Sequence, residues 1–273
     1  MTYGCSYSAH GASSGIGRAT AVLFAKLGAG VALVGRDEDR LHKTLLLCEE
    51  QTKKAGSQAS HCIIKADLSI LEEISTAFNK TIQHFGKLDI LVNNAGIQIK
   101  DSVENFDAAA HEKLMNINVR SVLVLSNLAV PKLAETKGCI INISSVAGNR
   151  SFPGVLSYCM SKAAIEQFTK CAALAFADSS PFFFFTPELA PKGIRVNCVA
   201  PGVIVTELHR NAGMSEEEYA KFLGRAKNNS PLGHTGDSED VANSIAFLAS
   251  DATSYTTGNT IFVDGGWSRV CPR

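Results

Sequence analysis

Residues 139–162 read C-I-I-N-I-S-S-V-A-G-N-R-S-F-P-G-V-L-S-Y-C-M-S-K, and the character of this stretch changes twice along its length. It begins with an apolar, β-branched run at residues 140–143, which is typical of a buried strand. Two serines, Ser144 and Ser145, end this run, and a loop with glycines and a proline follows. A helical pattern then starts at about residue 155. Strand, loop and helix in this order form the repeating unit of an α/β fold.

On the predicted helix, Tyr158 and Lys162 are four residues apart, so both side chains project from the same face. A free tyrosine has a pKa of about 10, and a nearby ammonium favours the phenolate and lowers that pKa. A tyrosine tuned in this way can donate or accept a proton near pH 7. Ser144 or Ser145 is then placed to hold the oxygen atom that receives the proton. The spacing alone is weak, because a half-buried tyrosine beside a lysine is common on helices.

The same alternation of strand and helix continues along the chain. Further strands are predicted at residues 31–35, 62–66, 88–92, 194–199 and 260–264, and helices at 18–27, 38–54, 71–85, 106–133, 215–227 and 237–249. This pattern predicts a doubly wound parallel sheet of the Rossmann type with helices on both faces. Ligands of such sheets bind at the carboxyl ends of the strands, where the polar residues of this chain gather.

A glycine-rich turn, G-A-S-S-G-I-G at residues 11–17, precedes the first predicted helix. Turns of this kind let backbone N–H groups approach a phosphate at the positive end of a helix. A buried strand should come directly before the turn. Residues 4–10 are instead small and polar and end in His10, so the first strand is atypical and unconvincing as a strand.

Length and composition predict one globular domain over residues 1–273. Hydrophobic residues make up 45% and charged residues 19%, and 26 Lys and Arg balance 26 Asp and Glu. A net charge of zero argues against nucleic-acid or membrane-surface partners. Eight cysteines without a C-x-x-C or Cys/His cluster indicate no metal site and favour a reducing, cytoplasmic location. No apolar run reaches the length of a membrane span, and the N-terminus lacks a signal-peptide pattern.

The chain resembles the short-chain dehydrogenase/reductase family, in its compact single-domain branch, over nearly its whole length. The motifs that carry the resemblance are G-A-S-S-G-I-G, Asp67, N-N-A-G at 93–96, Asn118 in N-I-N-V-R-S, I-S-S-V-A-G, Y-C-M-S-K, R-V-N-C-V-A-P-G and F-V-D-G-G. The resemblance implies an NAD(P)-dependent oxidoreductase that interconverts a carbonyl and a secondary alcohol, similar to 3-oxoacyl reductases and other carbonyl-reducing members. It also implies a homodimer or homotetramer.

Four catalytic residues follow from the resemblance. Tyr158 is implied as the general acid in carbonyl reduction, and Lys162 as the residue that lowers its pKa and holds the nicotinamide ribose. Ser145 is implied to hold the substrate oxygen, with Ser144 as the competing candidate. Asn118 is implied to anchor a water molecule that links Lys162 to solvent.

The resemblance also implies a set of cofactor-binding residues at the ends of the strands, in addition to Tyr158 and Lys162. They are Gly11, Ser13, Gly15, Ile16 and Gly17 at the pyrophosphate, Asp67 at the adenine, Asn94 and Gly96 on the adenosine side, and Pro201, Gly202 and Thr206 beside the nicotinamide.

The choice between NADP and NAD depends on the end of the second predicted strand. An acidic residue there would repel a 2′-phosphate, but this strand ends in Gly35-Arg36. Arginine offers a planar, charged fork that suits a phosphate. We therefore expect NADP at Arg36, with NAD as the alternative that the neighbouring Asp37 favours.

Two features depart from the family pattern. His10 stands where the family has a threonine after an apolar strand, and residues 175–187 form an inserted loop, A-F-A-D-S-S-P-F-F-F-F-T-P. Both favour an alternative, a non-catalytic nucleotide-binding or scaffold protein on the same fold. The variable region after Pro201 predicts a mobile, mostly apolar lid over a small carbonyl or alcohol substrate.

Overall fold

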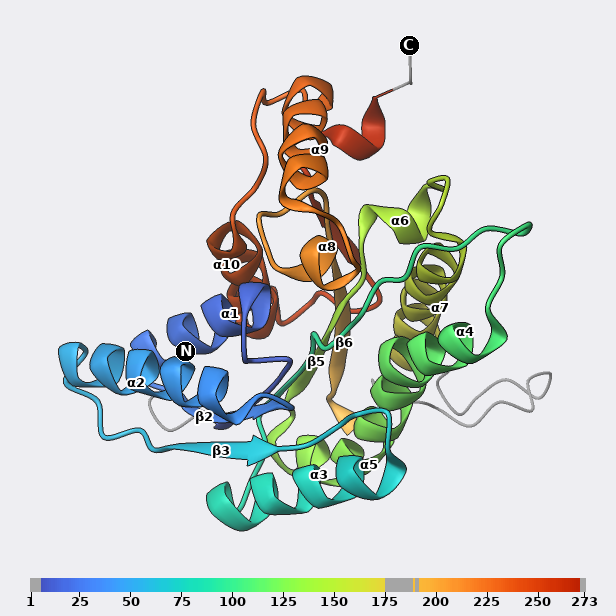
Figure 1. Ribbon diagram of the computed structural model, residues 1–273. Coiled ribbons are helices and arrows are strands. Elements are labelled where there is room, and N and C mark those ends of the chain that lie inside the picture. Colours follow the sequence, from blue (N-terminus) through green and yellow to red (C-terminus); the bar gives the residue numbers. More distant parts are fainter. Residues whose placement is uncertain (1–5, 175–188, 190–191, 271–273) are drawn as a thin grey trace.

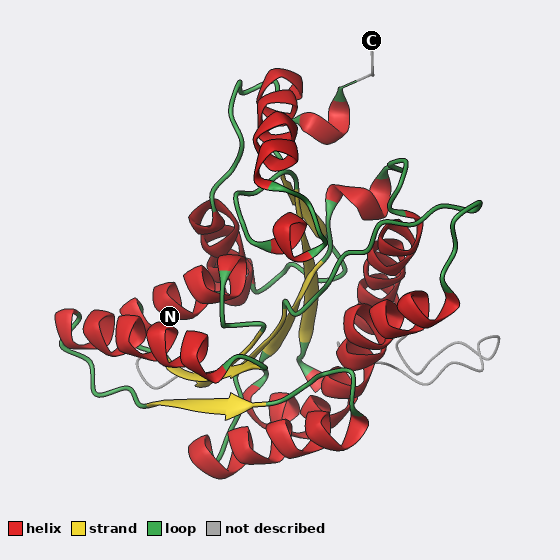
Figure 2. Ribbon diagram, viewed as in Figure 1, coloured by secondary structure: helices red, strands yellow, loops and turns green. Residues whose placement is uncertain are grey.

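The computed structural model describes residues 6–174, 189 and 192–270, and its centre is one parallel sheet (Figure 2). Seven strands lie in the order β3-β2-β1-β4-β5-β6-β7. The chain starts in the middle of the sheet, winds outward through β2 and β3, and then returns to build the other half. The strands are β1 (Ser6–His10), β2 (Gly30–Gly35), β3 (His61–Lys65), β4 (Ile90–Asn93), β5 (Cys139–Ile143), β6 (Arg195–Pro201) and β7 (Thr260–Val263). This confirms the predicted doubly wound sheet.

Helices cover both faces of the sheet (Figure 1). On one face, Phe24, Leu41 and Ile245 bring α1 (Gly15–Lys26), α2 (Glu38–Lys54) and α10 (Ser238–Ala249) into one apolar core. On the other face, Ile74 and Leu125 anchor α3 (Leu71–Phe85) and α5 (Ser121–Thr136), and α7 (Leu156–Ala173) packs beside them. The remaining helical segments are α4 (Ala108–Met115), η1 (Asn116–Arg120), α6 (Val146–Asn149), α8 (Leu208–Asn211), α9 (Glu216–Asn229), η3 (Asp251–Thr253) and η4 (Trp267–Arg269).

The polar first strand is a regular, buried strand, so the expectation that residues 4–10 would not form one is wrong for residues 6–10. β1 pairs with β2 and β4 on its two sides. Ser6 Oγ donates to Asp89 Oδ2 at 2.9 Å, and Ser8 Oγ lies 3.1 Å from His10 Nε2. The Tyr7 ring stacks on a phenylalanine of α1 with centroids 4.3 Å apart. The hydrogen bonds offset the desolvation of the two serine hydroxyls, although Tyr7 Oη and His10 Nδ1 are buried without a hydrogen-bond partner among the described residues. The central position in the sheet supplies both backbone ladders.

The helical region predicted at 106–133 corresponds to one uninterrupted helical stretch, Ala108–Thr136. Within it, the π-turn η1 lies between the α-helices α4 and α5. By length and composition this stretch is apolar enough to cross a membrane, contrary to the expectation that no run is long enough. That property is weak by itself, because core helices of soluble domains share it. The insertion predicted at 175–187 lies outside the described residues.

Candidate active site

A cavity of about 790 Å³ follows the carboxyl ends of the strands, as expected for a doubly wound sheet. Most of the residues predicted from the sequence line it together. They are Gly11, Ser13, Gly15, Ile16, Arg36, Asp67, Asn94, Gly96, Ser145, Tyr158, Lys162, Pro201, Gly202 and Thr206. The other two, Gly17 and Asn118, are buried and support this wall from behind.

The glycine turn between β1 and α1 leaves no room for a side chain at Gly11 or Gly17. A Cβ atom at Gly17 would lie 2.2 Å from the Gly11 carbonyl oxygen, and one at Gly11 would lie 2.9 Å from Asn94 Nδ2. Gly11 and Gly15 also have positive φ angles of 73° and 50°, which favour glycine. Asn94 Nδ2 donates to the carbonyl oxygen of His10 at 3.1 Å and so ties β4 to this turn. The cradle and the N-terminus of α1 together suit the pyrophosphate of a dinucleotide.

Tyr158 and Lys162 project from α7 into the cavity. Lys162 Nζ donates to the Ile143 carbonyl oxygen at 2.8 Å and lies 5.6 Å from the centre of the Tyr158 ring. Burial raises the pKa of Tyr158 to about 12, although the Ser145 hydroxyl beside it acts in the opposite direction. Burial also lowers the pKa of Lys162 to about 8. The expectation that Lys162 lowers the pKa of Tyr158 is therefore not met here, because desolvation of the phenolate outweighs its neighbours.

The two serines after β5 have different surroundings. Ser144 is buried, and its hydroxyl lies within hydrogen-bonding distance of two acceptors, Glu166 Oε1 at 3.0 Å and the Lys162 carbonyl oxygen at 3.1 Å. Ser145 lines the cavity, and its Oγ accepts the Ala147 N–H at 3.2 Å, which caps the short helix α6. Both serines line the cavity, but the Ser144 hydroxyl is engaged by Glu166 and the Lys162 backbone, whereas the Ser145 hydroxyl lies beside that of Tyr158.

Asn118 lies within the π-turn η1 and is 1% exposed. Its Oδ1 accepts the Ile97 N–H at 2.8 Å, and its Nδ2 donates to the Ile97 carbonyl oxygen at 2.9 Å and to Ser161 Oγ at 3.1 Å. The side chain therefore joins the loop after β4 to α7 next to Lys162. π-turns of this kind recur at functional sites.

The adenosine end of the cavity carries the two charged side chains expected there, Arg36 and Asp67. Asp67 follows β3, and its burial raises the pKa of the carboxyl group. Hydrogen bonds from Ser69 and the positive charges of Arg36 and Lys113 outweigh this effect, so the pKa lies below its usual value. Asp37 is engaged elsewhere, because its carboxylate caps α2 by accepting the Arg40 N–H at 3.0 Å and pairs with Arg40 Nε at 3.1 Å. Arg36, Asp37 and Arg40 all line this end of the cavity.

Sequence reasoning missed a network that positions Tyr158. Asp101 is buried and accepts the Ser157 N–H at 3.1 Å, and the Ser157 hydroxyl also donates to it. His111 Nδ1 lies 2.7 Å from the same hydroxyl. The network caps the first turn of α7 and joins it to α4. Asp101 is 56 residues away from Ser157 in sequence, so no local pattern could have revealed the contact.

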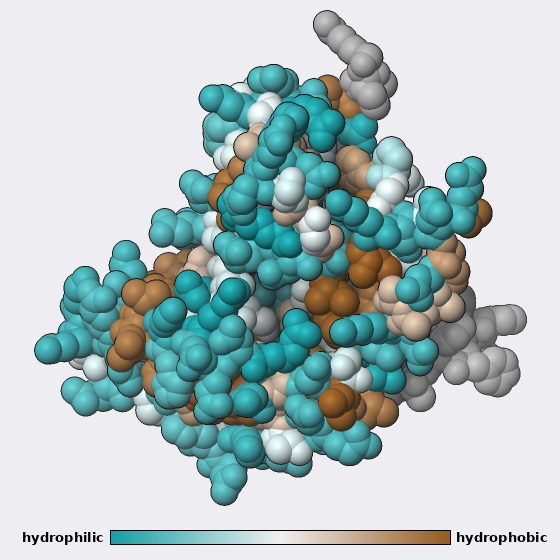
Figure 3. Space-filling model, in the orientation of Figure 1, coloured by the Kyte–Doolittle hydropathy of each residue, from teal (hydrophilic) through white to brown (hydrophobic). Residues whose placement is uncertain are grey.

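The end of the cavity beside Tyr158 carries apolar side chains from Ile97, Ile99 and Leu208. Together with Phe152 and Val155, these pack against the cluster of Leu114, Ala147 and Tyr158. Figure 3 shows apolar side chains gathered to the right of centre on this face, beside α4 and α7. In the described part of the chain, no three His, Cys, Asp or Glu side chains are grouped so that they could hold a metal ion.

Comparison with known protein families agrees with this geometry. A family model described as short chain dehydrogenase matches residues 9–217, and one described as Enoyl-(Acyl carrier protein) reductase matches residues 184–268. Glucose 1-dehydrogenase of Gluconobacter oxydans is 36% identical over 258 residues, which cover 94% of this chain and 89% of that protein. The 3-oxoacyl-(acyl-carrier-protein) reductase FabG of Thermotoga maritima is 36% identical over 262 residues, or 94% of each chain.

Solved structures agree as well. A structure with cofactor of a Caenorhabditis elegans short-chain dehydrogenase/reductase of unknown function has a TM-score of 0.86 at 34% identity, and the match covers 98% of this chain and 97% of that one. Levodione reductase has a TM-score of 0.85 at 27% identity, covering 99% of this chain and 100% of that one.

Proposed function

The chain belongs to the short-chain dehydrogenase family and is an oxidoreductase that acts on CH–OH donors and carbonyls. From this premise, we propose that it uses NADP to reduce a small carbonyl substrate. The observation that carries the proposal is the meeting of Ser145, Tyr158 and Lys162 with the glycine turn in one cavity. Stopped-flow measurement of NADPH oxidation against a panel of carbonyl compounds tests it. No turnover with any compound, despite NADPH binding, would favour a non-catalytic protein instead.

That non-catalytic alternative is not favoured. One of its two supports was the polar first strand, which forms and pairs on both sides, and the other, the insertion at 175–187, lies outside the described residues. The glycine turn that follows β1 is closely packed, and its residues line the cavity.

Each residue has a defined task in the proposed reaction. When bound, the nicotinamide would supply the hydride for the carbonyl carbon. Tyr158 donates the proton to the carbonyl oxygen, and its raised pKa keeps the hydroxyl protonated near neutral pH. Ser145 donates a hydrogen bond to the same oxygen, where negative charge develops. Lys162 positions the ribose and passes a proton towards Tyr158. Asn118, in the π-turn η1, anchors the water molecule that links Lys162 to solvent.

The two adjacent serines provide a matched test. Ser145→Ala should lower kcat by about 10²- to 10³-fold, the range expected for removal of one donor to a developing oxyanion. Ser144→Ala should leave kcat within about threefold, because its hydroxyl bonds to Glu166 and to the backbone of Lys162. Steady-state kinetics of both variants measure the difference. A larger loss of kcat in Ser144→Ala would assign the catalytic hydroxyl to Ser144.

NADP is the proposed cofactor because Arg36 lines the adenosine end of the cavity, while the carboxylate of Asp37, which lines the same end, is engaged in capping α2. The carboxylate that would repel a 2′-phosphate is thus occupied by Arg40. Arg36 supplies a charged fork for the phosphate, and the first turn of α2 adds a favourable partial charge.

Arg36→Ala should weaken NADPH binding by about 10- to 100-fold, because a hydrogen bond to a charged group contributes about 1.5–3 kcal/mol. NADH binding should change by less than about twofold, since NADH has no phosphate at this position. Titration calorimetry with both cofactors measures the selectivity. Arg225→Ala, on the exposed side of α9, is the matched control and should change neither affinity. Equal losses for NADPH and NADH in Arg36→Ala would exclude a contact with the 2′-phosphate.

The substrate is proposed to be a small apolar or mixed ketone or secondary alcohol, because apolar side chains pack beside Tyr158.

A cytoplasmic homodimer or homotetramer is proposed as the working form. Helices α5 and α7 carry apolar side chains that are between 42% and 52% exposed, namely Leu123, Met160 and, directly after α7, Leu174. These two helices therefore have apolar area available for contact with a second copy of the chain. The six described cysteines are all free thiols, which suits a reducing compartment. A single domain over residues 1–273 is likewise proposed.

A further inference from the structure

Thr206, on the loop after β6, lies directly over the glycine turn. A Cβ atom built on Gly15 would be 3.1 Å from Thr206 Cγ2, and both residues line the cavity. The chain just before Thr206 is fixed, because the Val205 N–H donates to the Gly236 carbonyl oxygen at 3.1 Å. The position of Thr206 relative to a bound dinucleotide therefore depends on what holds it from the other side.

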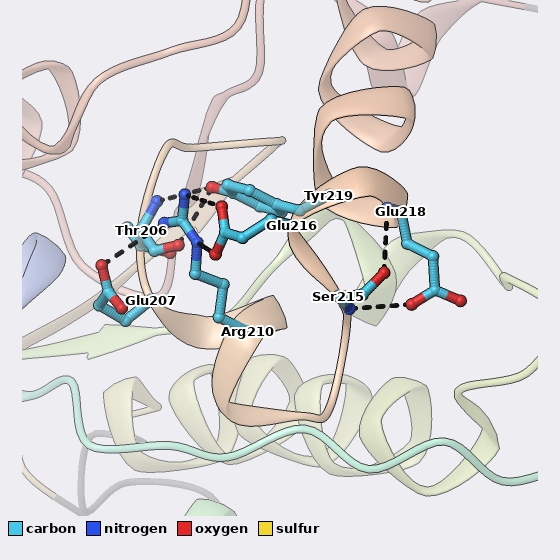
Figure 4. Close-up of polar contacts among 7 residues, drawn as sticks. All are labelled: Thr206, Glu207, Arg210, Ser215, Glu216, Glu218 and Tyr219. Atoms are coloured by element: carbon cyan, nitrogen blue, oxygen red, sulfur yellow. Dashed lines mark hydrogen bonds and ion pairs between the residues drawn. The ribbon is translucent and has the colours of Figure 1, made fainter.

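Tyr219, in the first turn of α9, supplies that contact (Figure 4). Its phenol oxygen accepts the Thr206 N–H at 3.3 Å and donates to the Thr206 carbonyl oxygen at 3.1 Å. Tyr219 is 2% exposed. One buried hydroxyl thus satisfies both backbone groups of Thr206, and nothing else on the tyrosine side chain can make a hydrogen bond.

Arg210 holds the Tyr219 ring in place from α8. Its guanidinium carbon lies 4.2 Å from the ring centroid. Its nitrogens pair with Glu216 at 2.6 and 3.1 Å and with Glu207 at 3.5 Å, so they join α8 to the start of α9 (Figure 4). A stacked arginine with bidentate ion pairing fixes orientation better than a single contact does.

The start of α9 is fixed as well. Ser215 Oγ accepts the Glu218 N–H at 3.2 Å, and the Glu218 carboxylate accepts the Ser215 N–H at 2.9 Å. This capping box orders the turn that carries Tyr219. The corner between α8 and α9 is thus a connected unit that ends on the backbone of Thr206.

We propose that Tyr219 is a positioning residue that holds Thr206 against the nicotinamide half of the bound dinucleotide. The corner between α8 and α9 thereby sets the affinity for the cofactor. This inference rests on the proposed function and on the placement of Thr206 beside the nicotinamide that the family resemblance implies. The adenosine half binds at Arg36 and Asp67, at the β2–β3 end of the same cavity, and does not depend on Tyr219.

The test compares the Kd for NADPH with the Kd for adenosine 2′,5′-bisphosphate, a fragment that contains only the adenosine half of the cofactor. Tyr219→Phe keeps the ring and the Arg210 stack but removes the hydroxyl, and the loss of two hydrogen bonds of about 0.5–1.5 kcal/mol each should raise the Kd for NADPH about tenfold. The Kd for adenosine 2′,5′-bisphosphate, which lacks the nicotinamide half, should stay within about twofold, since Arg36 and the adenine pocket are untouched. KM for NADPH should rise with Kd, while kcat at saturating NADPH changes less than about threefold, as for lost uniform binding.

Tyr255→Phe is the matched control, because Tyr255 is fully exposed and does not line the cavity. An unchanged Kd for NADPH in Tyr219→Phe would overturn the proposal, and so would an equal loss for the adenosine fragment, which would indicate general loosening of the site. If Tyr219→Phe does not fold, Arg210→Ala should give the same pattern, and its failure to do so would also overturn the proposal. A wild-type protein that binds neither NADPH nor NADH would instead contradict the proposed function itself.

Discussion

Replacing Tyr158 by phenylalanine should lower kcat for carbonyl reduction by about 10²- to 10⁴-fold, which is the usual contribution of a positioned general acid. The ring still fills its place among Leu114 and Ala147, so only the proton donor is lost. Burial raises the pKa of Tyr158 to about 12, and the hydroxyl therefore holds its proton until the carbonyl oxygen takes it. NADPH oxidation with a saturating carbonyl measures kcat, and calorimetry measures the Kd for NADPH, which should change less than about threefold.

Tyr255→Phe serves again as the control, because it makes the same chemical change at a fully exposed position. Retention of most of kcat in Tyr158→Phe would assign the proton donor to another group. A parallel collapse of kcat and NADPH affinity would mean that Tyr158 acts mainly through the shape of the cavity.

His10→Thr should change how the free energy of unfolding depends on pH. His10 is buried, and desolvation lowers its pKa from 6.5 to about 4. Above pH 6.5 the imidazole is neutral in both states. As the pH falls from about 6.5 to about 4, the unfolded chain takes up a proton that the folded protein does not, so stability decreases. The difference between these two pKa values corresponds to a loss of about 3 kcal/mol, because each pKa unit corresponds to about 1.36 kcal/mol.

Urea unfolding at pH 7 and pH 4.5 measures this loss in the wild type and in His10→Thr. Threonine has no titrating group and suits a strand, so the variant should lose about 2–3 kcal/mol less than the wild type over this range. His42→Gln removes an exposed histidine from α2 and should leave the wild-type pH dependence unchanged. Identical pH dependence in wild type and His10→Thr would show that His10 titrates alike in both states.

Local pattern predicted most of the described elements. The helix predicted at 38–54 agrees with α2 at both ends, and that predicted at 71–85 agrees with α3, because acidic first turns and glycine ends mark their boundaries. The strand at 31–35 is an unbroken apolar run, which is typical of a strand buried on both faces. These elements depend on backbone preference and burial within one segment, both of which sequence carries.

The first strand and the Tyr158 pKa were predicted incorrectly for one shared reason. Both depend on groups that come from elsewhere in the chain. Ser6 bonds to Asp89, which is 83 residues away, and the Tyr7 ring stacks on a ring of α1. The pKa of Tyr158 depends on how completely the surrounding side chains exclude water, and spacing on one helix does not reveal this.

The sequence by itself determined the doubly wound parallel sheet, the order of its elements and the identity of the residues at its carboxyl edge. It could do so because strand and helix periods and glycine turns are local properties. Only the tertiary structure decided that the Ser144 hydroxyl is engaged by Glu166, that the Asp37 carboxylate pairs with Arg40, and that Tyr219 bonds to the backbone of Thr206. Each of these depends on the direction of a side chain relative to a partner, and that direction is set by packing between elements rather than by the residues of one element.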